Sequence, residues 1–445
     1  MAIHSDYLLE QLSPYDSVKR WWLGFSGGLD SQVLLDLALS AGLHKSHDLQ
    51  ILHVHHGLQD EADSWVEDCR KRCQDLGVPL TVSRVQVSQG ASPEAMAREA
   101  RYQVFDTVVA EGDGLLLAHH QDDQAETMLL RLLRGSGPKG LSGIPQHRSL
   151  AKGALVRPLL GLSRQQLEAH AQQQRLQWIE DPSNQSLQHD RNYLRHQVLP
   201  QLKQRWPHAL DAFSRTARFC HEADQLNQQL AAMDYQQCGV SGRLQCPQLL
   251  ALAPERQRNL IRYWLRESSL LLPEERVMEQ ILSQLLNARP DAEPCVSWGD
   301  VQMRRFQQQL YLVDGRWQPP LKKCSWDLRQ PLCFSFGELS VQPACGEGVK
   351  IPAGSRVEVG FRQGGEKLRL HGREGSRSLK KLLQEAQVPP WRRPLLPLIY
   401  VDGELAAVAD LWISEDYQAV QAVNEEALIK FVWDAFFYAS RDCDK

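Results

Sequence analysis

The sequence of 445 residues lacks several features that would assign it to common classes of protein. It has no run of about 18 apolar residues, the length that a helix needs to cross a bilayer. Its N-terminus lacks the basic flank and apolar run of a secretory signal. Its ten cysteines form no CxxC pair. These absences exclude a membrane protein, predict a cytoplasmic location with reduced thiols, and argue against a zinc or redox centre.

The length and the changes of pattern along the chain predict three domains. Apolar residues make up 42% and charged residues 23%, which is ordinary for a globular protein. We predict an α/β domain over residues 1–209, a mainly helical domain over 210–315 and a small mixed α+β domain over 325–445. The stretch 316–323, with its Pro319-Pro320 pair, is the expected linker.

The first 160 residues alternate short apolar runs with longer helical patterns. The predicted strands are Trp22–Phe25, Ile51–His55, Leu80–Val87 and Leu115–Ala118. Such alternation predicts a doubly wound parallel sheet. Because ligands bind outside the carboxyl ends of parallel strands, we expect Ser26, His55 and His119 to line one crevice.

The loop Ser26-Gly27-Gly28-Leu29-Asp30-Ser31 joins the first strand to a helix that opens near Asp30. Unpaired N–H groups and the positive end of a helix dipole would meet there, which predicts an anion site. The glycines would let the backbone approach phosphate, and Asp30 could hold Mg²⁺. Neither GxxxxGK[ST] nor GxGxxG is present, so an ordinary helix-start loop is the alternative.

A second motif runs from His119 to Thr127 and leads into Arg134. The helical period predicts a core face of Ala125, Met128, Leu129 and Leu132. It places Asp123, Glu126, Thr127 and Arg134 on the opposite face. Because two close carboxylates are costly to keep ionised without a cation, Asp123 and Glu126 indicate Mg²⁺ coordination or a general base. A solvated charged face is the alternative.

Two further groups of residues favour contacts with a nucleotide or a polyanion. The run His53-Val54-His55-His56-Gly57-Leu58 puts histidines at a strand end without the ligand set of a zinc site. Residues 361–393 carry a local charge of +6, although the whole chain has −4. The basic residues there are Arg362, Lys367, Arg369, Arg373, Arg377, Lys380, Lys381, Arg392 and Arg393. Ordinary surface charge is the alternative to a polyanion site.

The motifs resemble those of a known enzyme family. SGGLDS alone resembles the loop of the PP-loop ATP pyrophosphatases, which cleave ATP between the α and β phosphates. Together with HVHHGL, HHQDDQAET, Arg157-Pro158-Leu159, WIEDPSN and Asp190–Arg195, it is similar to the tRNA(Ile)-lysidine synthetase family in its three-domain bacterial form. The similarity continues through Arg362…Gly364…Glu366, Lys380-Lys381-Leu382-Leu383 and Pro390-Trp391-Arg392-Arg393.

The resemblance implies a ligase that modifies tRNA. ATP would adenylate the wobble cytidine of a tRNA(Ile) with a CAU anticodon, and free L-lysine would then displace AMP. The product, lysidine, changes codon reading from AUG to AUA and tRNA identity from Met to Ile.

The resemblance also implies roles for particular residues. ATP would contact the loop from Ser26 to Ser31 together with His55 and His119. Asp30, Asp123 and Glu126 would be catalytic, with Mg²⁺ on Asp30 and Asp123. Arg134, Arg191 and Arg195 would contact lysine or RNA near the active site. Contacts to the tRNA would come from Arg362, Arg369, Lys380, Lys381, Arg392 and Arg393. The base that activates lysine is left open among His55, His119, Asp123 and Glu126, and a homodimer is one open alternative for the assembly.

The motifs disfavour three rival functions. A tRNA-thiolating enzyme needs sulfur-handling cysteines, and the chain has no CxxC pair. GMP synthetase carries a glutaminase domain ahead of its loop, for which 25 preceding residues leave no room. A non-catalytic RNA-binding protein has no need of intact SGGLDS and HHQDDQAET motifs.

Overall fold

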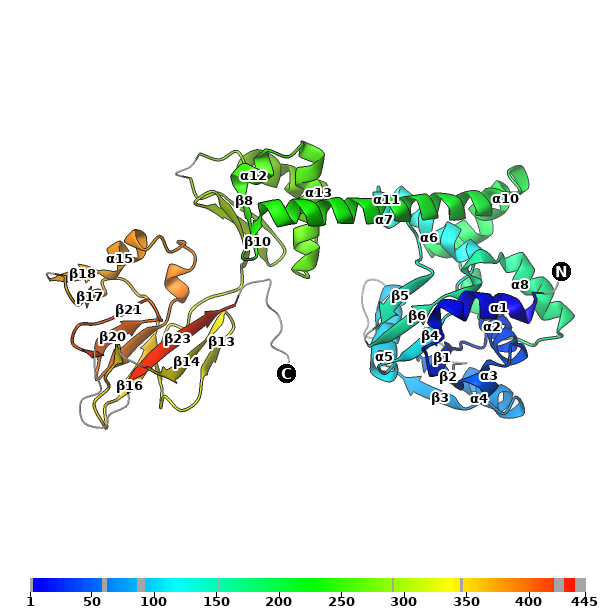
Figure 1. The fold of residues 1–445 in the computed structure, drawn as a ribbon. Helices are drawn as coiled ribbons and strands as arrows, with labels where there is room; N and C mark the ends of the chain where they lie inside the picture. Colours follow the sequence, from blue (N-terminus) through cyan, green and yellow to red (C-terminus); the bar gives the residue numbers. More distant parts are fainter. Residues whose placement is uncertain are drawn as a thin grey trace. The chain divides into compact units, whose positions relative to one another are not determined.

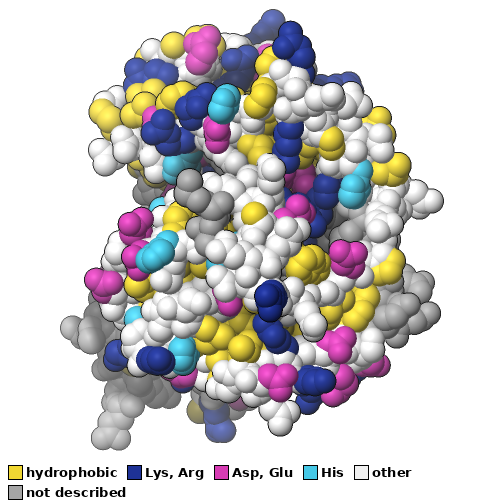
Figure 2. Space-filling model, turned by 90° about the vertical axis from the view of Figure 1, so that its right-hand side faces the viewer, with side chains coloured by type: hydrophobic (Ala, Val, Ile, Leu, Met, Phe, Trp, Pro, Cys, Tyr) yellow, Lys and Arg dark blue, Asp and Glu magenta, His cyan; other side chains and the backbone are white. Residues whose placement is uncertain are grey.

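The computed structural model describes residues 3–57, 62–85, 93–150, 152–289, 292–344, 347–373, 375–419 and 428–436. The chain forms two compact units, residues 1–226 and 227–445 (Figure 1). Figure 2 shows one face of the molecule, on which Lys and Arg side chains gather toward the top of the view. Among the described residues, no helix combines the length and apolar character needed to cross a membrane.

The first unit is built on a six-stranded sheet with the order β3-β2-β1-β4-β6-β5. The strands are β1 Arg20–Gly24, β2 Asp48–His55, β3 Leu80–Arg84, β4 Asp113–Leu116, β5 His147–Leu150 and β6 Gly153–Val156. All neighbours pair in parallel except β5, which runs antiparallel at the edge. The predicted doubly wound parallel sheet is confirmed. The part of the expected third strand beyond Val85 lies outside the described residues.

Two cores cover the two faces of this sheet. Trp21 and Leu23 of β1 belong to one core, and Trp22 between them belongs to the other. Each face is covered by helices, as a parallel sheet with near-continuous apolar strands requires. The helices of the unit are α1 Ser5–Leu12, α2 Leu29–Ser40, α3 Leu43–Ser46, α4 Ala62–Asp75, α5 Pro93–Val108, α6 Gln121–Leu133, α7 Pro138–Leu141, α8 Arg164–Gln173, α9 Asp190–Tyr193 and α10 Leu199–Arg205. Ser163 is the N-cap of α8, and its side chain accepts from the backbone N–H of Gln166.

The part of the chain from 209 to 314 combines helices with a sheet. Its helices are α11 Ala209–Cys238, α12 Cys246–Leu250, α13 Pro254–Glu267 and α14 Glu275–Gln280, and a π-helical turn, Ile281–Leu285, follows α14. A five-stranded antiparallel sheet has the order β7-β8-β11-β10-β9. Its strands are β7 Gly239–Val240, β8 Arg243–Gln245, β9 Cys295–Trp298, β10 Val301–Phe306 and β11 Gln309–Asp314. Gln309–Val313 has a strand-like pattern in the sequence, but the rest of this sheet was not predicted. The strands β7 and β8 have only two and three residues, and β10 buries Arg305 where an alternating pattern would place an apolar residue.

The C-terminal part is mixed α+β, as predicted. Two five-stranded sheets have the orders β12-β16-β19-β20-β21 and β13-β14-β23-β15-β22. The strands are β12 Cys324–Ser325, β13 Leu332–Phe334, β14 Gly337–Pro343, β15 Gly348–Val349, β16 Val357–Gly360, β19 Leu398–Val401, β20 Glu404–Val408, β21 Trp412–Ile413, β22 Gln418–Ala419 and β23 Ile429–Ala435. A hairpin of β17 Lys367–Arg369 and β18 Ser376–Ser378 leads into α15 Leu379–Glu385.

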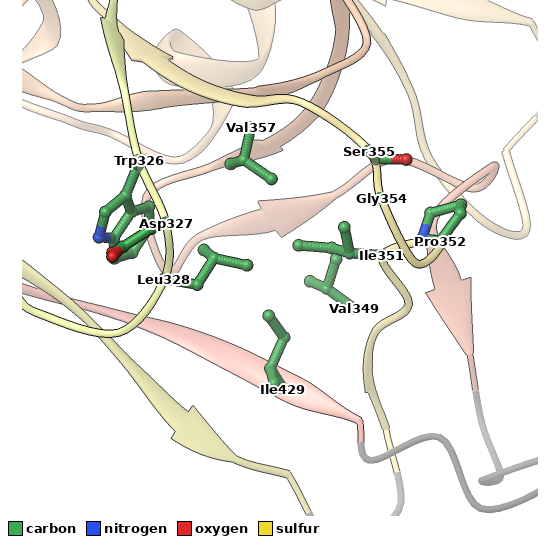
Figure 3. Close-up of a pocket in the computed structure, with 10 residues that line it drawn as sticks. All are labelled: Trp326, Asp327, Leu328, Val349, Ile351, Pro352, Gly354, Ser355, Val357 and Ile429. Carbon is green, nitrogen blue, oxygen red and sulfur yellow. The ribbon is translucent and has the colours of Figure 1, made fainter.

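A cavity of about 330 Å³ opens between these C-terminal elements. The side chains of Leu328, Ile351 and Ile429 converge on it, and the loop at Gly354 and Ser355 borders it (Figure 3). Its lining combines apolar side chains with Asp327 and Ser355 and contains none of the predicted site residues.

Candidate active site

The loop from Ser26 to Ser31 has the backbone geometry of an anion cradle. Gly27 has φ +82°, and a Cβ there would lie 2.7 Å from Ile179 Cδ1. Gly28 is the N-cap of α2, so the first N–H groups of the helix have no capping side chain. Ser31 Oγ donates to the Gly28 carbonyl at 3.0 Å and holds the turn closed. The sequence therefore needs glycine here for both conformation and space.

The predicted histidines follow neighbouring strands of the sheet. His55 ends β2 and is buried, and its Nε2 lies 3.4 Å from Asp63 Oδ1. His119 follows β4 and accepts a hydrogen bond at Nδ1 from Arg157 Nε, at 3.3 Å. Burial lowers the pKa of His119 to about 3, so its ring is neutral and carries its proton on Nε2. Ser26, His55 and His119 thus lie at the carboxyl edge of one sheet, on the strands in the order β2-β1-β4.

The predicted core face of α6 is partly wrong. Ala125 and Met128 are buried, but the Leu132 side chain is 55% exposed, while Glu126 is fully buried and Asp123 is 8% exposed. Over its first two turns α6 is therefore buried on both faces, and only its C-terminal end is exposed. Asp123 and Glu126 are not on the solvated face that was the alternative, because arginines from a distant segment pack over them.

Asp123 and Glu126 are joined to Arg191 and Arg195 in one network. Arg191 donates to Glu126 Oε2 at 2.6 Å and to Asp123 Oδ1 at 2.9 Å. Arg195 donates to Glu126 Oε1 at 2.6 Å and to Oε2 at 3.1 Å. Arg191 lies on α9, and Arg195 lies on the π-helical turn Leu194–Val198 that follows it. The cation that balances the two carboxylates in this structure is thus the guanidinium group, which suits carboxylates because it donates in a planar fork.

His120 links this network to the phosphate loop. Its side chain is fully buried, and its Nε2 lies 3.5 Å from Asp30 Oδ2 and 3.5 Å from Asp123 Oδ2. Burial works against a charged ring, but the carboxylates of Asp123, Asp30 and Asp122 outweigh it and raise the pKa of His120. Burial likewise opposes the charge of Asp123, yet His120 and Arg191 hold the pKa of Asp123 well below its usual range. Both shifts favour the charged form of the side chain.

Asp122 anchors α6 from its other side. It accepts the backbone N–H of Arg164 at 2.8 Å, at the start of α8, and it pairs with Lys203 of α10. Lys203 and His120 are parts of the site that were not predicted. Lys203 carries no local signal, because its partner is 81 residues away. His120 could have been found, since it precedes the carboxylates within the motif.

Asp30 and Asp123 differ in how well they fit a metal ion. Oδ1 of Asp30 is buried and has no hydrogen-bond partner, which suits a hard cation such as Mg²⁺. Both oxygens of Asp123 already accept hydrogen bonds, from Arg191 and from the backbone N–H of His120. No group of three or more His, Cys, Asp or Glu side chains among the described residues is arranged to hold a metal ion.

The remaining predicted basic residues do not all lie on open surface. Arg134 is exposed at the C-terminal end of α6, about 12 Å along the helix from Glu126. Lys380 and Lys381 on α15 are exposed as well. Arg369 pairs with Glu415 at 2.6 Å, and Arg362 lies 3.9 Å from Glu366.

Arg392 and Arg393 are half-buried. Burial, and then the charge of Arg243, lowers the pKa of Arg392 to about 10. Arg393 donates to the Val388 carbonyl at 2.8 Å. Trp391, which directly precedes these arginines, packs on Phe306 and Tyr311, with ring centroids at 6.0 Å and 5.3 Å. These contacts give the Pro390–Arg393 segment a part in the packing of the second unit.

The fold and the loop define the class of protein, an ATP-using enzyme of the PP-loop type. A family model described as "PP-loop domain" matches residues 1–202. Models described as "TilS substrate binding domain" and "TilS substrate C-terminal domain" match residues 244–311 and 357–433.

Relatives of known name cover almost the whole chain. A tRNA(Ile)-lysidine synthase of Coxiella burnetii is 40% identical over 418 residues, which is 93% of either chain. One of Pseudomonas putida is 44% identical over 90% of this chain and 94% of the relative. The chain belongs to the tRNA(Ile)-lysidine synthase family. It is accordingly an ATP-dependent ligase that forms a carbon–nitrogen bond.

Two solved structures show weaker similarity. A U34-tRNA thiolase of Methanococcus maripaludis is 17% identical with a TM-score of 0.42, covering 49% of this chain and 78% of the thiolase. A structure titled "Crystal structure of TILS C-terminal domain" is 22% identical with a TM-score of 0.22, covering 26% of this chain and 98% of that domain.

The buried network predicts a large effect on stability. Arg195→Met would leave the buried Glu126 with a single cationic partner, and breaking a buried pair costs about 3–5 kcal/mol. At about 2–4 °C per kcal/mol, we expect the melting transition of the N-terminal unit to fall by at least roughly 6 °C in calorimetry.

Arg164→Met is the matched control. Arg164 forms an i,i+4 pair with Glu168 on the surface of α8, and both side chains are more than one-third exposed. An exposed pair contributes at most about 1 kcal/mol, so the transition should shift little. Equal shifts in the two variants would show that the network adds no more than a surface pair.

Proposed function

We propose that the chain ligates free L-lysine to position 2 of the wobble cytidine of a tRNA(Ile) with a CAU anticodon. The reaction gives lysidine, AMP and pyrophosphate, and changes codon reading from AUG to AUA. The observation that carries the proposal is the juxtaposition at one sheet edge of the glycine loop and the carboxylate–arginine network, joined through His120. The similarity to lysidine synthases along 93% of the chain supports the identity of the substrate.

In the first step, the O2 atom of the cytidine attacks the α-phosphorus of ATP. A P–O bond forms, the bond between the α and β phosphates breaks, and pyrophosphate leaves. We assign the cradle for the leaving group to Ser26, Gly27, Gly28, Leu29, Asp30 and Ser31. Preorganised N–H groups stabilise the charge that develops on the leaving oxygen, since they need no reorganisation. The free N–H groups at the start of α2, behind Gly28, support this role.

Mg²⁺ would supply additional positive charge for the phosphates when bound. Asp30 is the proposed ligand because its buried Oδ1 has no hydrogen-bond partner among the described residues. Asp123, which was also expected to bind Mg²⁺, contributes instead through His120, whose charge it stabilises. His55 and His119 are proposed to contact ATP from the ends of the two strands that flank β1.

In the second step, the ε-nitrogen of lysine attacks C2 of the adenylated base. A C–N bond forms, the C2–O bond breaks, and AMP leaves with the oxygen. The ammonium group must first lose a proton, which costs about 4.6 kcal/mol at pH 7 for a pKa of about 10.4. We assign Arg191 and Arg195 to contacts with lysine or RNA, with Asp123 and Glu126 orienting them. Arg134 is the more distant member of this group.

The tRNA body is proposed to bind the basic C-terminal part. Arg362, Arg369, Lys380, Lys381, Arg392 and Arg393 are the candidate contacts. Lys380 and Lys381 are the strongest, because both are exposed on α15 and the arginines have partners within the protein. Contacts with phosphate position a nucleic acid, whereas the target base must leave its stack to react.

We place the reaction in the cytoplasm. The described cysteines are all free thiols, which agrees with a reducing compartment. Burial raises the pKa of Cys69 to about 12 and that of Cys73 to about 11, so neither thiol suits sulfur transfer. The raised pKa of the Cys69 thiol, which lies next to Gly27 of the loop, therefore disfavours a thiolating activity.

Incorporation of labelled lysine tests the proposed function. We expect label in transcripts of tRNA(Ile) with the CAU anticodon, only when ATP and Mg²⁺ are present, and none in the methionine tRNA that shares this anticodon. Pyrophosphate should be released in equal amount to the lysine incorporated. Pyrophosphate release without incorporation would instead indicate another second substrate.

The variant Asp30→Asn tests the loop. The loss of one negative charge at an atom without a protein partner should remove metal binding and abolish pyrophosphate release, while the affinity for tRNA changes less than about twofold. Filter binding and a pyrophosphate assay measure the two quantities. Asp16→Asn, a change on the exposed turn before β1, is the matched control. Near-normal release in Asp30→Asn would remove this carboxylate from the mechanism.

Paired substitutions test the C-terminal surface. We expect Lys380→Gln with Lys381→Gln to weaken tRNA binding and to reduce the slope of log K against log salt by about 1.8, because each neutralised phosphate contributes about 0.9. Arg392→Gln with Arg393→Gln should instead lower the melting temperature of the second unit. If the Arg392/Arg393 variant reduced the salt slope more than the Lys380/Lys381 variant, the tRNA contacts would be assigned to the two arginines instead.

A further inference from the structure

A cluster of arginines surrounds Tyr102, outside the network described above. The guanidinium carbon of Arg98 on α5 lies 5.2 Å from the ring centroid of Tyr102, and that of Arg148 on β5 lies 4.5 Å from it. Arg157, which follows β6, donates from Nη2 to the Tyr102 hydroxyl at 3.1 Å. Three elements distant in sequence thus bring positive charge to one aromatic ring.

The described part of the chain gives the cluster no acidic partner. Arg157 is 2% exposed, and its other hydrogen bonds go to His119 Nδ1 and to the Pro145 carbonyl, at 2.7 Å. Among the residues that the structure describes, no carboxylate lies within ion-pair distance of Arg98, Arg148 or Arg157. Burial, and then the charges of Arg148 and Arg98, lower the pKa of Arg157.

The contrast with the active-site arginines is informative. Arg191 and Arg195 are balanced by two carboxylates, as buried charges usually are. Like charges held together without a counter-charge cost free energy. We therefore expect an anion from outside the chain to balance the positive charge of Arg98, Arg148 and Arg157.

The position of the cluster separates it from the nucleotide loop. The loop follows β1, whereas Arg157 follows β6, and β4 lies between these two strands. At about 4.8 Å per strand, this separation is about 10 Å. Phosphates held by the loop would thus lie at the end of β1, not at the end of β6. The cluster is still connected to the predicted ATP contact His119 through the hydrogen bond from Arg157.

We propose that Arg98, Arg148 and Arg157 form a subsite for a backbone phosphate of the RNA substrate next to the target cytidine. The proposal rests on the proposed function, which brings RNA to this edge of the sheet. Arg98 and Arg148 are exposed and make the direct contacts, while the buried Arg157 supplies fixed positive charge behind them. Tyr102 holds the guanidinium groups by cation–π contacts. A phosphate bound here positions the anticodon loop, so that the neighbouring base can enter the active site.

The single variants Arg98→Gln and Arg148→Gln test the subsite, since both side chains are exposed and the fold should tolerate their loss. We expect each to weaken binding of the tRNA(Ile) transcript about fivefold and to reduce the slope of log K against log salt by about 0.7–0.9. The KM values for ATP and for lysine should change less than twofold. Arg148→Lys should retain most of the slope. Arg70→Gln on α4, whose side chain is 56% exposed, is the matched control and should leave all these quantities unchanged.

The outcomes separate the possible sources of phosphate. An unchanged tRNA affinity and salt slope in both Gln variants would overturn the subsite. A rise in the KM for ATP with unchanged tRNA binding would assign the cluster to the nucleotide and overturn the assignment to RNA. If the wild-type chain binds the tRNA but forms no lysidine, the proposed function fails, yet the comparison of salt slopes still decides the subsite. If the wild-type chain binds no tRNA, both proposals are wrong.

Discussion

The balance of buried charge at the carboxyl edge of the first sheet is the constraint on which the site depends. Glu126 is fully buried and Asp123 nearly so, and the guanidinium groups of Arg191 and Arg195 lie against both carboxylates. The arginines come from a segment more than 60 residues further along the chain. Their pairing therefore holds α9 and the π-helical turn against α6. Lys203 and Asp122 fasten the next helix in the same way.

Two kinds of positive charge meet at this edge. One is balanced within the protein and serves to fix geometry, as in the network of Asp123, Glu126, Arg191 and Arg195. The other is unbalanced, as around Tyr102, where arginines face neutral acceptors only. A reaction between ATP, a polyanionic RNA and a cationic amino acid needs both. Fixed ion pairs preserve the shape of the pocket, and uncompensated arginines attract phosphate.

The two poorest predictions have a common physical cause. The core face of α6 was predicted from its apolar residues, and Arg392 and Arg393 were assigned to tRNA contacts from their charge. In α6 the carboxylates pair with arginines of a remote segment, and next to Arg392 the Trp391 ring packs on Phe306 and Tyr311, contacts that a local period does not reveal. Most of the sheet of the middle part was missed because β7 and β8 have only two and three residues and β10 buries Arg305 at an inward position.

The sequence by itself determined the parallel sheet, the position of the phosphate loop and the family of the enzyme. These follow from local patterns: continuous apolar strands, glycines that alone tolerate φ +82° at position 27, and motifs in a fixed order. Only the tertiary structure decided which cation balances Asp123 and Glu126, that His120 joins them to Asp30, and that no described carboxylate pairs with the arginines around Tyr102. The reason is that electrostatic compensation depends on distances in space, and pairs such as Arg157–Tyr102 and Arg195–Asp123 are 55 and 72 residues apart in the chain.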